Sequence, residues 1–468
     1  MNRHYFNTKG SISALITEYE EMSQKGVVCF YEESVFMQLI DFYEYSKQWI
    51  KALTVTNYAI TRHEASANLL MRKAQLLVSQ DCLDEAFAAL EIAQKRAPLN
   101  WNIRFAKADI LSLKGEHKCA LILLHHMKKN CDNETLADVF VYEAGIFENL
   151  RQYRRMFKAL CEALTLVPTH EDAAHQMIAA VSHLGNFKES IAFNEYLLDR
   201  DPYLKWAWFN LGYALAATNR VNDAIEAYEF ACSLDEDFEQ AYQECAQLLV
   251  DKQQYAAALN YYLHILSRTT TEIAQTLLQV GVCYTQLGDH RKGYAFYLEA
   301  LEMDPNCWET HYRIGAFHAS LGCWKEAIKC YRKALYREDE REEIYAAMGE
   351  AYFQLKKYQK GIFYFAKATE IAPDLVEYWL EPAAFLMDSG RTSAAMEILE
   401  TAEMNIPDIE IQYAKIACMY SSGRRAEAAY LLGELLVVDF EPHTTLFRMS
   451  PILELDMSIQ KMIDLFKK

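Results

Sequence analysis

The stretch KWAWFNLGYALAATNRVNDAIEAYEFACSLDEDF, residues 205–238, decides the fold. Its first half repeats apolar and small residues at the spacing i, i+3, i+4 and i+7, which places them on one face of a helix: Trp208, Leu211, Gly212 and Leu215. A turn at residues 219–222 leads into a second helix, on which small and aromatic residues share a face: Ala224, Tyr228 and Ala231. Two helices this short cannot bury their apolar faces alone, so the pattern predicts neighbouring copies.

The same pattern recurs along nearly the whole chain. With Lys205 as position 1 of a 34-residue unit, twelve units start at residues 33, 67, 101, 137, 171, 205, 239, 274, 308, 342, 376 and 410. Two extra residues precede Ala137 and one precedes Ala274.

Small residues and prolines test this frame independently. Position 8, in the first helix, is Gly or Ala in ten of the twelve units, and the exceptions are Ile40 and Ile178. Position 20, in the second helix, is small in every unit except the one with Met156, if the turn of the last unit is one residue shorter. Proline must end the second helix because it lacks a backbone donor, and six of the nine prolines share position 32: Pro98, Pro168, Pro202, Pro305, Pro373 and Pro407.

The pattern resembles the tetratricopeptide repeat (TPR) family, whose signature is W-x2-L-G-x2-Y, then A-x3-F, A and P. The match is close in residues 277–305 and 345–373. The resemblance implies an all-α fold: a right-handed α-solenoid, or superhelix, of antiparallel helix-turn-helix TPR units. A solenoid has no single core, so the array counts as one domain despite its length. We expect an N-terminal lead-in and capping helix in residues 1–32, the array of about twelve units in residues 33–440, and a C-terminal capping helix in residues 441–468.

Some units depart from the family pattern. Arg104, Lys107 and Glu143 occupy positions that are normally apolar, which predicts local distortion or a ligand-facing surface. The polar segment KNCDNET, residues 129–135, carries the two-residue insertion and is a candidate hinge. Pro382 lies inside a predicted first helix and should kink it.

Composition narrows the function classes. The net charge of −18 argues against a nucleic-acid partner, because phosphate binding depends on Lys and Arg. The twelve cysteines are scattered without a CxxC pair, which is typical of reduced thiols in the cytoplasm. Neither a signal peptide nor a membrane-spanning segment is evident, so we expect a cytoplasmic protein without membrane contact.

Two groups of residues imitate metal or catalytic sites. The segment HEDAAH places His170 and His175 five residues apart, whereas the zinc-protease motif needs two histidines four apart on one helical face. His311 and His318 are about 10 Å apart along one helix, too far for one zinc ion. We therefore expect His311 and His318 to replace the usual Trp and Tyr. No phosphate loop, nucleophile elbow or dinucleotide motif is present. We predict a non-enzyme with no cofactor and no metal.

The TPR resemblance also indicates where a partner would bind. In that family the first helices line a concave groove through positions near 2, 5, 6, 9, 12 and 13. Here those positions form an aromatic and amide-rich strip that could pack against, and hydrogen-bond to, an extended peptide. The predicted binding residues are Trp206, Phe209, Asn210, Tyr213, Gln243, Gln247, Gln279, Tyr312 and Arg313.

Three function classes stay open at this point. The favoured one is a scaffold or adaptor that binds a protein or extended peptide of unknown identity. The second is a peptide-sensing regulatory TPR protein, and the third is a helical-repeat RNA-binding protein, which the charge disfavours. A chaperone C-terminal tail is a disfavoured partner, because the Lys and Asn clamp that the family uses at positions 5 and 9 is missing: these positions hold Phe209 and Tyr213 or Tyr312 and Ala316. Self-association is left open.

Overall fold

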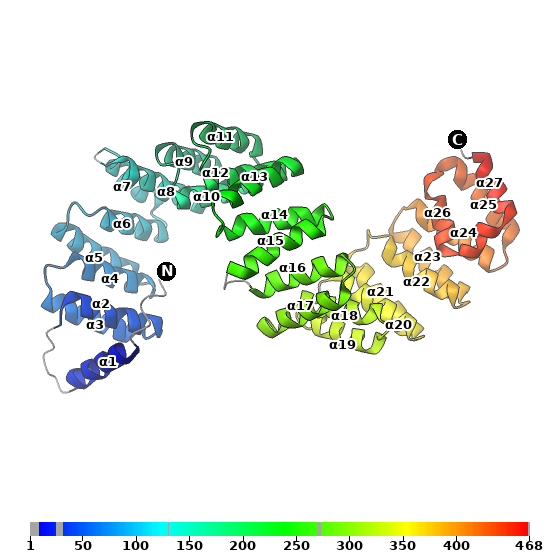
Figure 1. Cartoon of the computed structure of the whole chain (residues 1–468), viewed down its shortest axis with the longest axis horizontal. Coiled ribbons are helices and arrows are strands. Elements are labelled where there is room, and N and C mark those ends of the chain that lie inside the picture. Colours follow the sequence, from blue (N-terminus) through cyan, green and yellow to red (C-terminus); the bar gives the residue numbers. More distant parts are fainter. Residues whose placement is uncertain (1–8, 25–30, 130, 269–272, 467–468) are drawn as a thin grey trace. The chain divides into compact units, whose positions relative to one another are not determined.

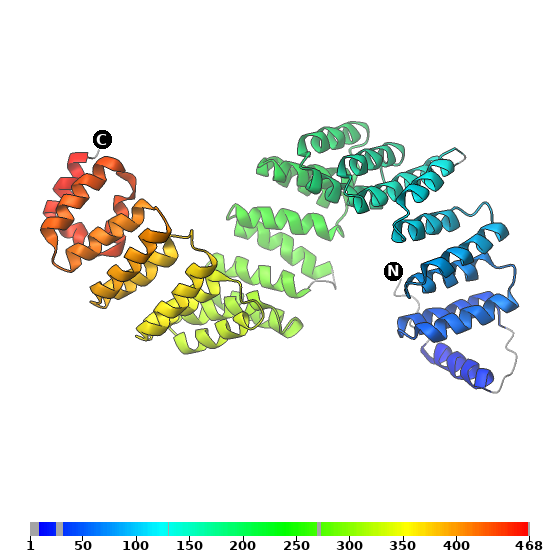
Figure 2. The same cartoon turned by 180° about the vertical axis from the view of Figure 1, so that it is seen from behind.

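The computed structural model describes residues 9–24, 31–129, 131–268 and 273–466, and every regular element within them is a helix (Figures 1 and 2). Contacts between Cα atoms divide the chain into two compact units, residues 1–241 and 242–468. Each unit is described by itself below. Among the described residues, no helix is both long and apolar enough to cross a membrane.

The first unit is a lead-in helix followed by six antiparallel helix pairs, and it ends within α14. Its helices are α1 (Lys9–Gln24), α2 (Glu33–Tyr45), α3 (Trp49–Arg62), α4 (Ala67–Val78), α5 (Leu83–Arg96), α6 (Trp101–Leu113), α7 (His117–Met127), α8 (Asn133–Asn149), α9 (Tyr153–Leu166), α10 (Glu171–Leu184), α11 (Phe187–Arg200), α12 (Lys205–Ala217) and α13 (Val221–Leu234).

The second unit continues the helix pairs and ends in a group of short helices. Its helices are α14 (Glu239–Asp251), α15 (Tyr255–Arg268), α16 (Ile273–Gln286), α17 (His290–Met303), α18 (Trp308–Ser320), α19 (Trp324–Leu335), α20 (Glu342–Gln354), α21 (Tyr358–Ile371), α22 (Glu377–Asp388), α23 (Thr392–Asn405), α24 (Ile409–Ser421), α25 (Arg425–Val438), α26 (Thr444–Met449) and α27 (Met457–Phe466), with 3₁₀ turns at Glu441–His443 and Pro451–Leu455.

One left-handed residue marks the turn inside each repeat. The residues with positive φ are Lys47, Asp81, Gly115, Arg151, Gly185, Asn219, Gln253, Gly288, Gly322, Lys356, Gly390 and Gly423. Each occupies position 15 of its unit, except Gly423, which occupies position 14 because the last turn is one residue shorter. This conformation lets the chain reverse direction in a few residues, and its recurrence supports twelve repeats.

Within a repeat, the two helices meet where an aromatic ring lies on a glycine. A Cβ atom built on Gly349 would lie 2.5 Å from Cδ2 of Phe365, and one built on Gly212 would lie 2.7 Å from the ring of Tyr228. Gly281 and Gly315 meet the rings of Tyr297 and Tyr331 in the same way. In these four repeats position 8 is glycine because a ring from position 24 occupies the space that a side chain would need.

Between repeats, a side-chain donor at position 4 reaches back to the proline at position 32 of the preceding unit. The indole Nε1 of Trp208 donates to the carbonyl of Pro202 at 2.9 Å, and Trp379 donates to Pro373 at 3.1 Å. His311 donates from Nε2 to the carbonyl of Pro305 at 3.1 Å. The expectation that His311 stands in for the usual Trp is thus confirmed.

The residues that depart from the pattern in repeats 3 and 4 have partners within the fold. Arg104 makes the position-4 bond, donating to the carbonyl of Pro98 at 3.1 Å. Lys107 donates to Gln94 at 2.9 Å, and the buried carboxylate of Glu143 pairs with Lys128 at 2.7 Å. Each of the three residues thus has a partner on another segment, and a ligand-facing surface there stays a prediction.

Packed helices lie at both ends of the chain. Helix α1 contacts α2 and α3, since Glu20 accepts from the hydroxyl of Tyr43 at 3.0 Å and pairs with Lys51 at 2.9 Å. At the other end α27 buries Ile459 and Ile463 against the core of the last repeat. Between the last repeat and α27, α26 packs on α24.

The sequence predicted a hinge in residues 129–135 and a kink at Pro382. Asn130, inside the segment 129–135, lies outside the described residues. The end of that segment is helical, because Asp132 caps α8 by accepting from the backbone of Thr135 at 2.9 Å. Helix α8 therefore starts at Asn133, one turn before the repeat start at Ala137. Pro382 is buried within α22, and its kink stays a prediction.

The glycine–ring contact can be tested with two alanine substitutions. Gly349→Ala should lower the free energy of unfolding of the second unit by about 1–3 kcal/mol, because the new methyl group overpacks against Phe365. Gly433→Ala, at a helical glycine with no atom within 4 Å of the added Cβ, should raise it by up to about 1 kcal/mol. Urea unfolding followed by circular dichroism measures both changes, and hydrogen exchange in α20 and α21 localises the first. Equal effects of the two substitutions would contradict the contact.

Candidate functional site

A groove crosses the first helices of three consecutive repeats in the first unit. It has a volume of about 570 Å³ and is lined by residues of α6, α8 and α10. Apart from Ile146 and His170, its lining residues occupy positions 2, 5, 6, 9, 12 or 13 of their repeats. We refer to it as the α6–α8–α10 groove.

Two features of α8 shape this groove. Tyr142 stacks on Phe105 of α6, with ring centroids 4.4 Å apart and an interplanar angle of 12°, and together they form an aromatic platform. One turn further along, Gly145 adds no side chain, and a Cβ built there would meet nothing within 4 Å. The groove is therefore open above Gly145.

The groove is negatively charged. Burial, and then the charges of Asp109, Asp138 and Asp172, raise the pKa of Tyr142 to about 12. Although Asp109 is open to solvent on one side, burial against the surrounding protein raises its pKa to about 6. Among the described residues Asp109, Glu148 and Asp172 form no ion pair, so their charges are available to a ligand.

His170 has a structural role at the edge of the groove. Its Nδ1 accepts from the backbone of Ala173 at 3.2 Å and caps the start of α10. Its Nε2 therefore carries the proton and donates to Asp138 at 3.0 Å. Both ring nitrogens of this residue, part of the segment that imitates a zinc motif, are thus engaged within the protein.

Buried polar atoms without partners lie on α10 and α12. Gln176 lines the groove, and its Oε1 is buried without a hydrogen-bond partner in the described structure. On α12, Nε1 of Trp206 and Oδ1 of Asn210 are likewise buried and unpartnered. Unsatisfied buried polar atoms cost free energy, about 1–3 kcal/mol each.

The sequence model of the tetratricopeptide repeat family matches residues 207–238, 274–307 and 342–375. The chain therefore contains tetratricopeptide repeats in these three segments.

Comparison with known proteins identifies relatives that are distant. Tetratricopeptide repeat protein 37 of Xenopus laevis is 22% identical over 369 residues, which cover 66% of this chain and 23% of that protein. The anaphase-promoting complex subunit CDC16 of Saccharomyces cerevisiae is 21% identical over 237 residues, 42% of this chain and 28% of that protein. This TPR chain thus spans roughly a quarter of the length of either relative. The solved APC/C hetero-tetramer Cut9-Hcn1 aligns with a TM-score of 0.41 and 14% identity, covering 87% of this chain and 97% of that one.

The predicted aromatic and amide strip is divided between the two units. In the first unit Phe209 and Asn210 are 5% and 2% exposed, and Asn210 donates to the carbonyl of Ala174 at 3.0 Å, so both residues pack between helices. Trp206 and Tyr213 are half-buried. The ring of Trp206 lies edge-on to that of Phe238, with centroids 4.6 Å apart.

In the second unit the residues of the predicted strip differ in exposure and in the partners they already have. Gln243 is exposed and Gln279 is half-buried. Gln247 donates to Asp251 in its own helix at 3.0 Å. Arg313 pairs with Glu309 at 3.2 Å, and its guanidinium lies 5.9 Å from the centroid of the Tyr312 ring. Binding at these residues stays a prediction, and Arg313 would have to exchange its carboxylate partner to take part.

The residues of the α6–α8–α10 groove were missed by the sequence reasoning, although the position frame contains them. Asp109, Tyr142 and Asp172 stand at positions 9, 6 and 2 of repeats 3, 4 and 5. Repeats 3 and 4 depart from the family pattern, and a strip defined by aromatic and amide residues leaves carboxylates out. The same positions, applied to every repeat, include these three residues among the candidates.

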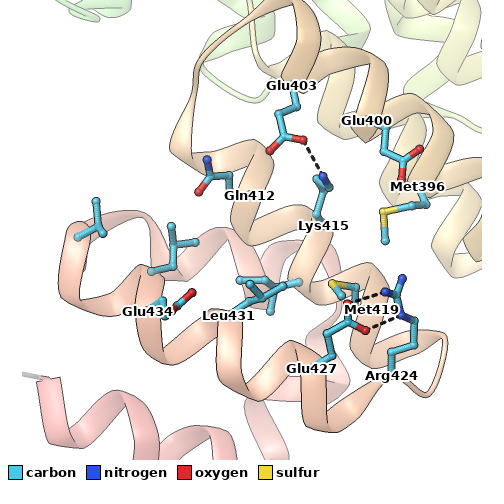
Figure 3. A pocket seen from close by; sticks show the side chains of 13 residues that line it. Met396, Glu400, Glu403, Gln412, Lys415, Met419, Arg424, Glu427, Leu431 and Glu434 are labelled. Atoms are coloured by element: carbon cyan, nitrogen blue, oxygen red, sulfur yellow. Dashed lines mark hydrogen bonds and ion pairs between the residues drawn. The ribbon is translucent and has the colours of Figure 1, made fainter.

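A second groove lies on the last two repeats, between α23, α24 and α25 (Figure 3). It has a volume of about 540 Å³ and an apolar floor that includes Met396, Met419 and Leu431. Its rim charges are largely paired with each other: Glu403 with Lys415 at 2.6 Å and Glu427 with Arg424 at 2.6 Å. This internal pairing leaves less charge for a ligand than in the α6–α8–α10 groove.

Asp109→Asn should stabilise the TPR array at neutral pH and have a smaller effect in acid. The folded state raises the pKa of Asp109 to about 6, above the usual value of about 3.9. Between these two pKa values the carboxyl group holds its proton more tightly in the folded protein than in the unfolded chain. The free energy of unfolding therefore falls as pH rises, and the full loss is reached above about pH 6. Asparagine avoids this loss.

Thermal unfolding at pH 4.5 and pH 7.5, followed by circular dichroism, measures the difference between variant and wild type. Asp199→Asn, at an exposed residue on α11 outside the groove, controls for the loss of one negative charge. A difference for Asp109→Asn that is the same at both pH values would contradict the shifted pKa.

Proposed function

We propose that this TPR chain is a non-enzymatic scaffold that binds an extended segment of a partner protein in the α6–α8–α10 groove. The observation that carries the proposal is the open space at Gly145 beside the Tyr142–Phe105 platform, in a groove that unpaired carboxylates line. An extended peptide suits such a groove, because its backbone has donors and acceptors at regular spacing and no competing internal hydrogen bonds.

The charge of the groove selects the partner segment. Asp109, Glu148 and Asp172 favour Lys or Arg side chains, and the Tyr142–Phe105 platform suits their aliphatic stems or a stacked guanidinium. The opposite charge would also steer association and make affinity fall with salt. We therefore propose a basic segment as the partner.

The comparisons are compatible with a scaffold. The yeast relative is a subunit of the anaphase-promoting complex, a multiprotein assembly, which supports a role in protein interaction without naming a partner. Trp206 and Tyr213, in the same unit as the groove, stay in the proposal as additional contact residues. Gln243, Gln279 and Tyr312 stay proposed contact residues of the second unit by itself. The absence of nucleic-acid and membrane partners, and a cytoplasmic location, are parts of the same proposal.

Filling the groove at Gly145 tests the proposal. Peptides selected from a random phage-displayed library on the wild-type chain should be rich in Lys and Arg, and synthetic copies should bind in fluorescence anisotropy. Gly145→Leu should weaken them at least about ten-fold, because the new side chain projects into open groove and not into packed helices. Gly433→Leu is the matched control, since it makes the same change at another uncrowded helical glycine.

A charge variant separates groove binding from general attraction. Asp109→Asn with Asp172→Asn should reduce both affinity and its salt dependence, whereas Glu195→Gln with Asp199→Asn on α11 makes the same charge change away from the groove. Circular dichroism checks that each variant stays helical. If selected peptides lack basic residues, or bind Gly145→Leu as well as wild type, the proposed site is wrong.

A further inference from the structure

Cationic side chains gather at the end of α19 in the second unit, although the whole chain carries a net charge of −18. Arg332, Lys333 and Arg337 line a hollow of about 450 Å³, whose other walls are Leu301, Pro305, His311 and Tyr336. This hollow is distinct from both grooves described above and lies within α17, α19 and the start of α18. We refer to it as the α19 hollow.

Neutral groups hold the two arginines of the α19 hollow. Arg332 donates to the hydroxyl of Tyr352 at 2.9 Å. Arg337 donates to the side-chain oxygen of Asn306, and its guanidinium lies 5.3 Å from the centroid of the Tyr336 ring. These contacts orient both guanidinium groups without neutralising them.

Carboxylates do not neutralise this cluster. Among the described residues Arg332, Lys333 and Arg337 form no ion pair, although the chain has 65 acidic residues for 47 basic ones. Elsewhere cations are paired, as Lys205 is with Asp235 at 2.8 Å and Lys415 with Glu403 at 2.6 Å. Asp304 is the carboxylate whose charge influences His311, and it already accepts a hydrogen bond from the backbone N–H of Asn306 at 2.9 Å.

A favourable helix dipole accounts for only part of this arrangement. Cations near a helix C-terminus are stabilised by the helix dipole, but three side by side repel one another. Exposed cations can avoid that repulsion by turning into solvent, whereas Arg332 and Arg337 are held by Tyr352 and Asn306. Two oriented guanidinium groups and the Lys333 ammonium, none of them in an ion pair among the described residues, therefore suit a multiply charged oxyanion.

We propose that the α19 hollow binds the phosphate group of a phosphorylated serine or threonine in a partner protein. A phosphomonoester carries nearly two charges and three strong acceptor oxygens, which match three cations, and guanidinium groups donate to it in pairs. Leu301, Pro305 and Tyr336 give the apolar surface on which the residues beside the phosphorylated one can rest. His311 forms a wall, because its Nε2 proton is already donated to Pro305.

Binding of a defined phosphopeptide tests this proposal. The probe is a fluorescein-labelled peptide with one phosphoserine among glycines and serines, compared in fluorescence anisotropy with its unphosphorylated and glutamate forms on the full chain. The phosphorylated form should bind at least about ten-fold more tightly than either, and inorganic phosphate should compete with it. Lys333→Gln with Arg337→Gln should weaken binding at least about ten-fold.

Matched controls decide between the hollow and general electrostatics. Lys356→Gln with Lys357→Gln removes the same charge at exposed residues in the turn before α21 and should leave binding unchanged. Lys333→Glu alone should weaken binding further than Lys333→Gln, and circular dichroism confirms that the variants fold. The proposal is overturned if the glutamate peptide binds equally well, if both double variants lose binding equally, or if single-stranded RNA of equal charge binds more tightly through the same residues.

Discussion

The close approach of an aromatic ring to a glycine backbone is the contact on which the other features of this molecule depend. Tyr228, Tyr297, Tyr331 and Phe365 each lie against the glycine sixteen residues earlier, with no room for a side chain between. In the second repeat Ala74 and Leu90 hold the same two positions and are buried in one cluster. This contact fixes the crossing of the two helices in a repeat, and it thereby decides which positions of the first helix stay free.

Because the packing fixes the free positions, the sequence could predict where a binding surface lies within each repeat but not which repeats form it. Choosing repeats by their aromatic and amide content led to Phe209 and Asn210, which are buried. Asn210 is buried through its bond to the carbonyl of Ala174, thirty-six residues away, a contact that no local pattern reveals. Gly145 leaves open space in the groove, and Asp109 belongs to its lining because of how the helices pack. Neither property can be recognised from the neighbouring sequence.

Departures from a family pattern proved misleading for a related reason. Arg104 and His311 lower the apparent match because position 4 is usually aromatic, yet both keep the hydrogen bond to the preceding proline that Trp208 makes. What position 4 requires in these repeats is a donor of sufficient reach. In the same way six of the twelve left-handed turn residues are not glycine. Strain of about 1 kcal/mol or more at such a residue is tolerated when the helices on both sides fix the turn.

Net charge gives the weakest prediction of local binding, and the distance over which charges act explains why. At physiological salt, fields between exposed charges are largely screened beyond about 8 Å, so a ligand meets only the residues beside it. The −18 charge describes the α6–α8–α10 groove well, where unpaired carboxylates surround Tyr142. It fails at the α19 hollow, where Arg332 and Lys333 of the last turn of α19 and Arg337 just beyond it line one cavity. No continuous basic run exists there, so the sequence alone does not indicate the cluster. An acidic scaffold can therefore carry an anion site, provided that neutral partners such as Tyr352 and Asn306 hold its cations in place.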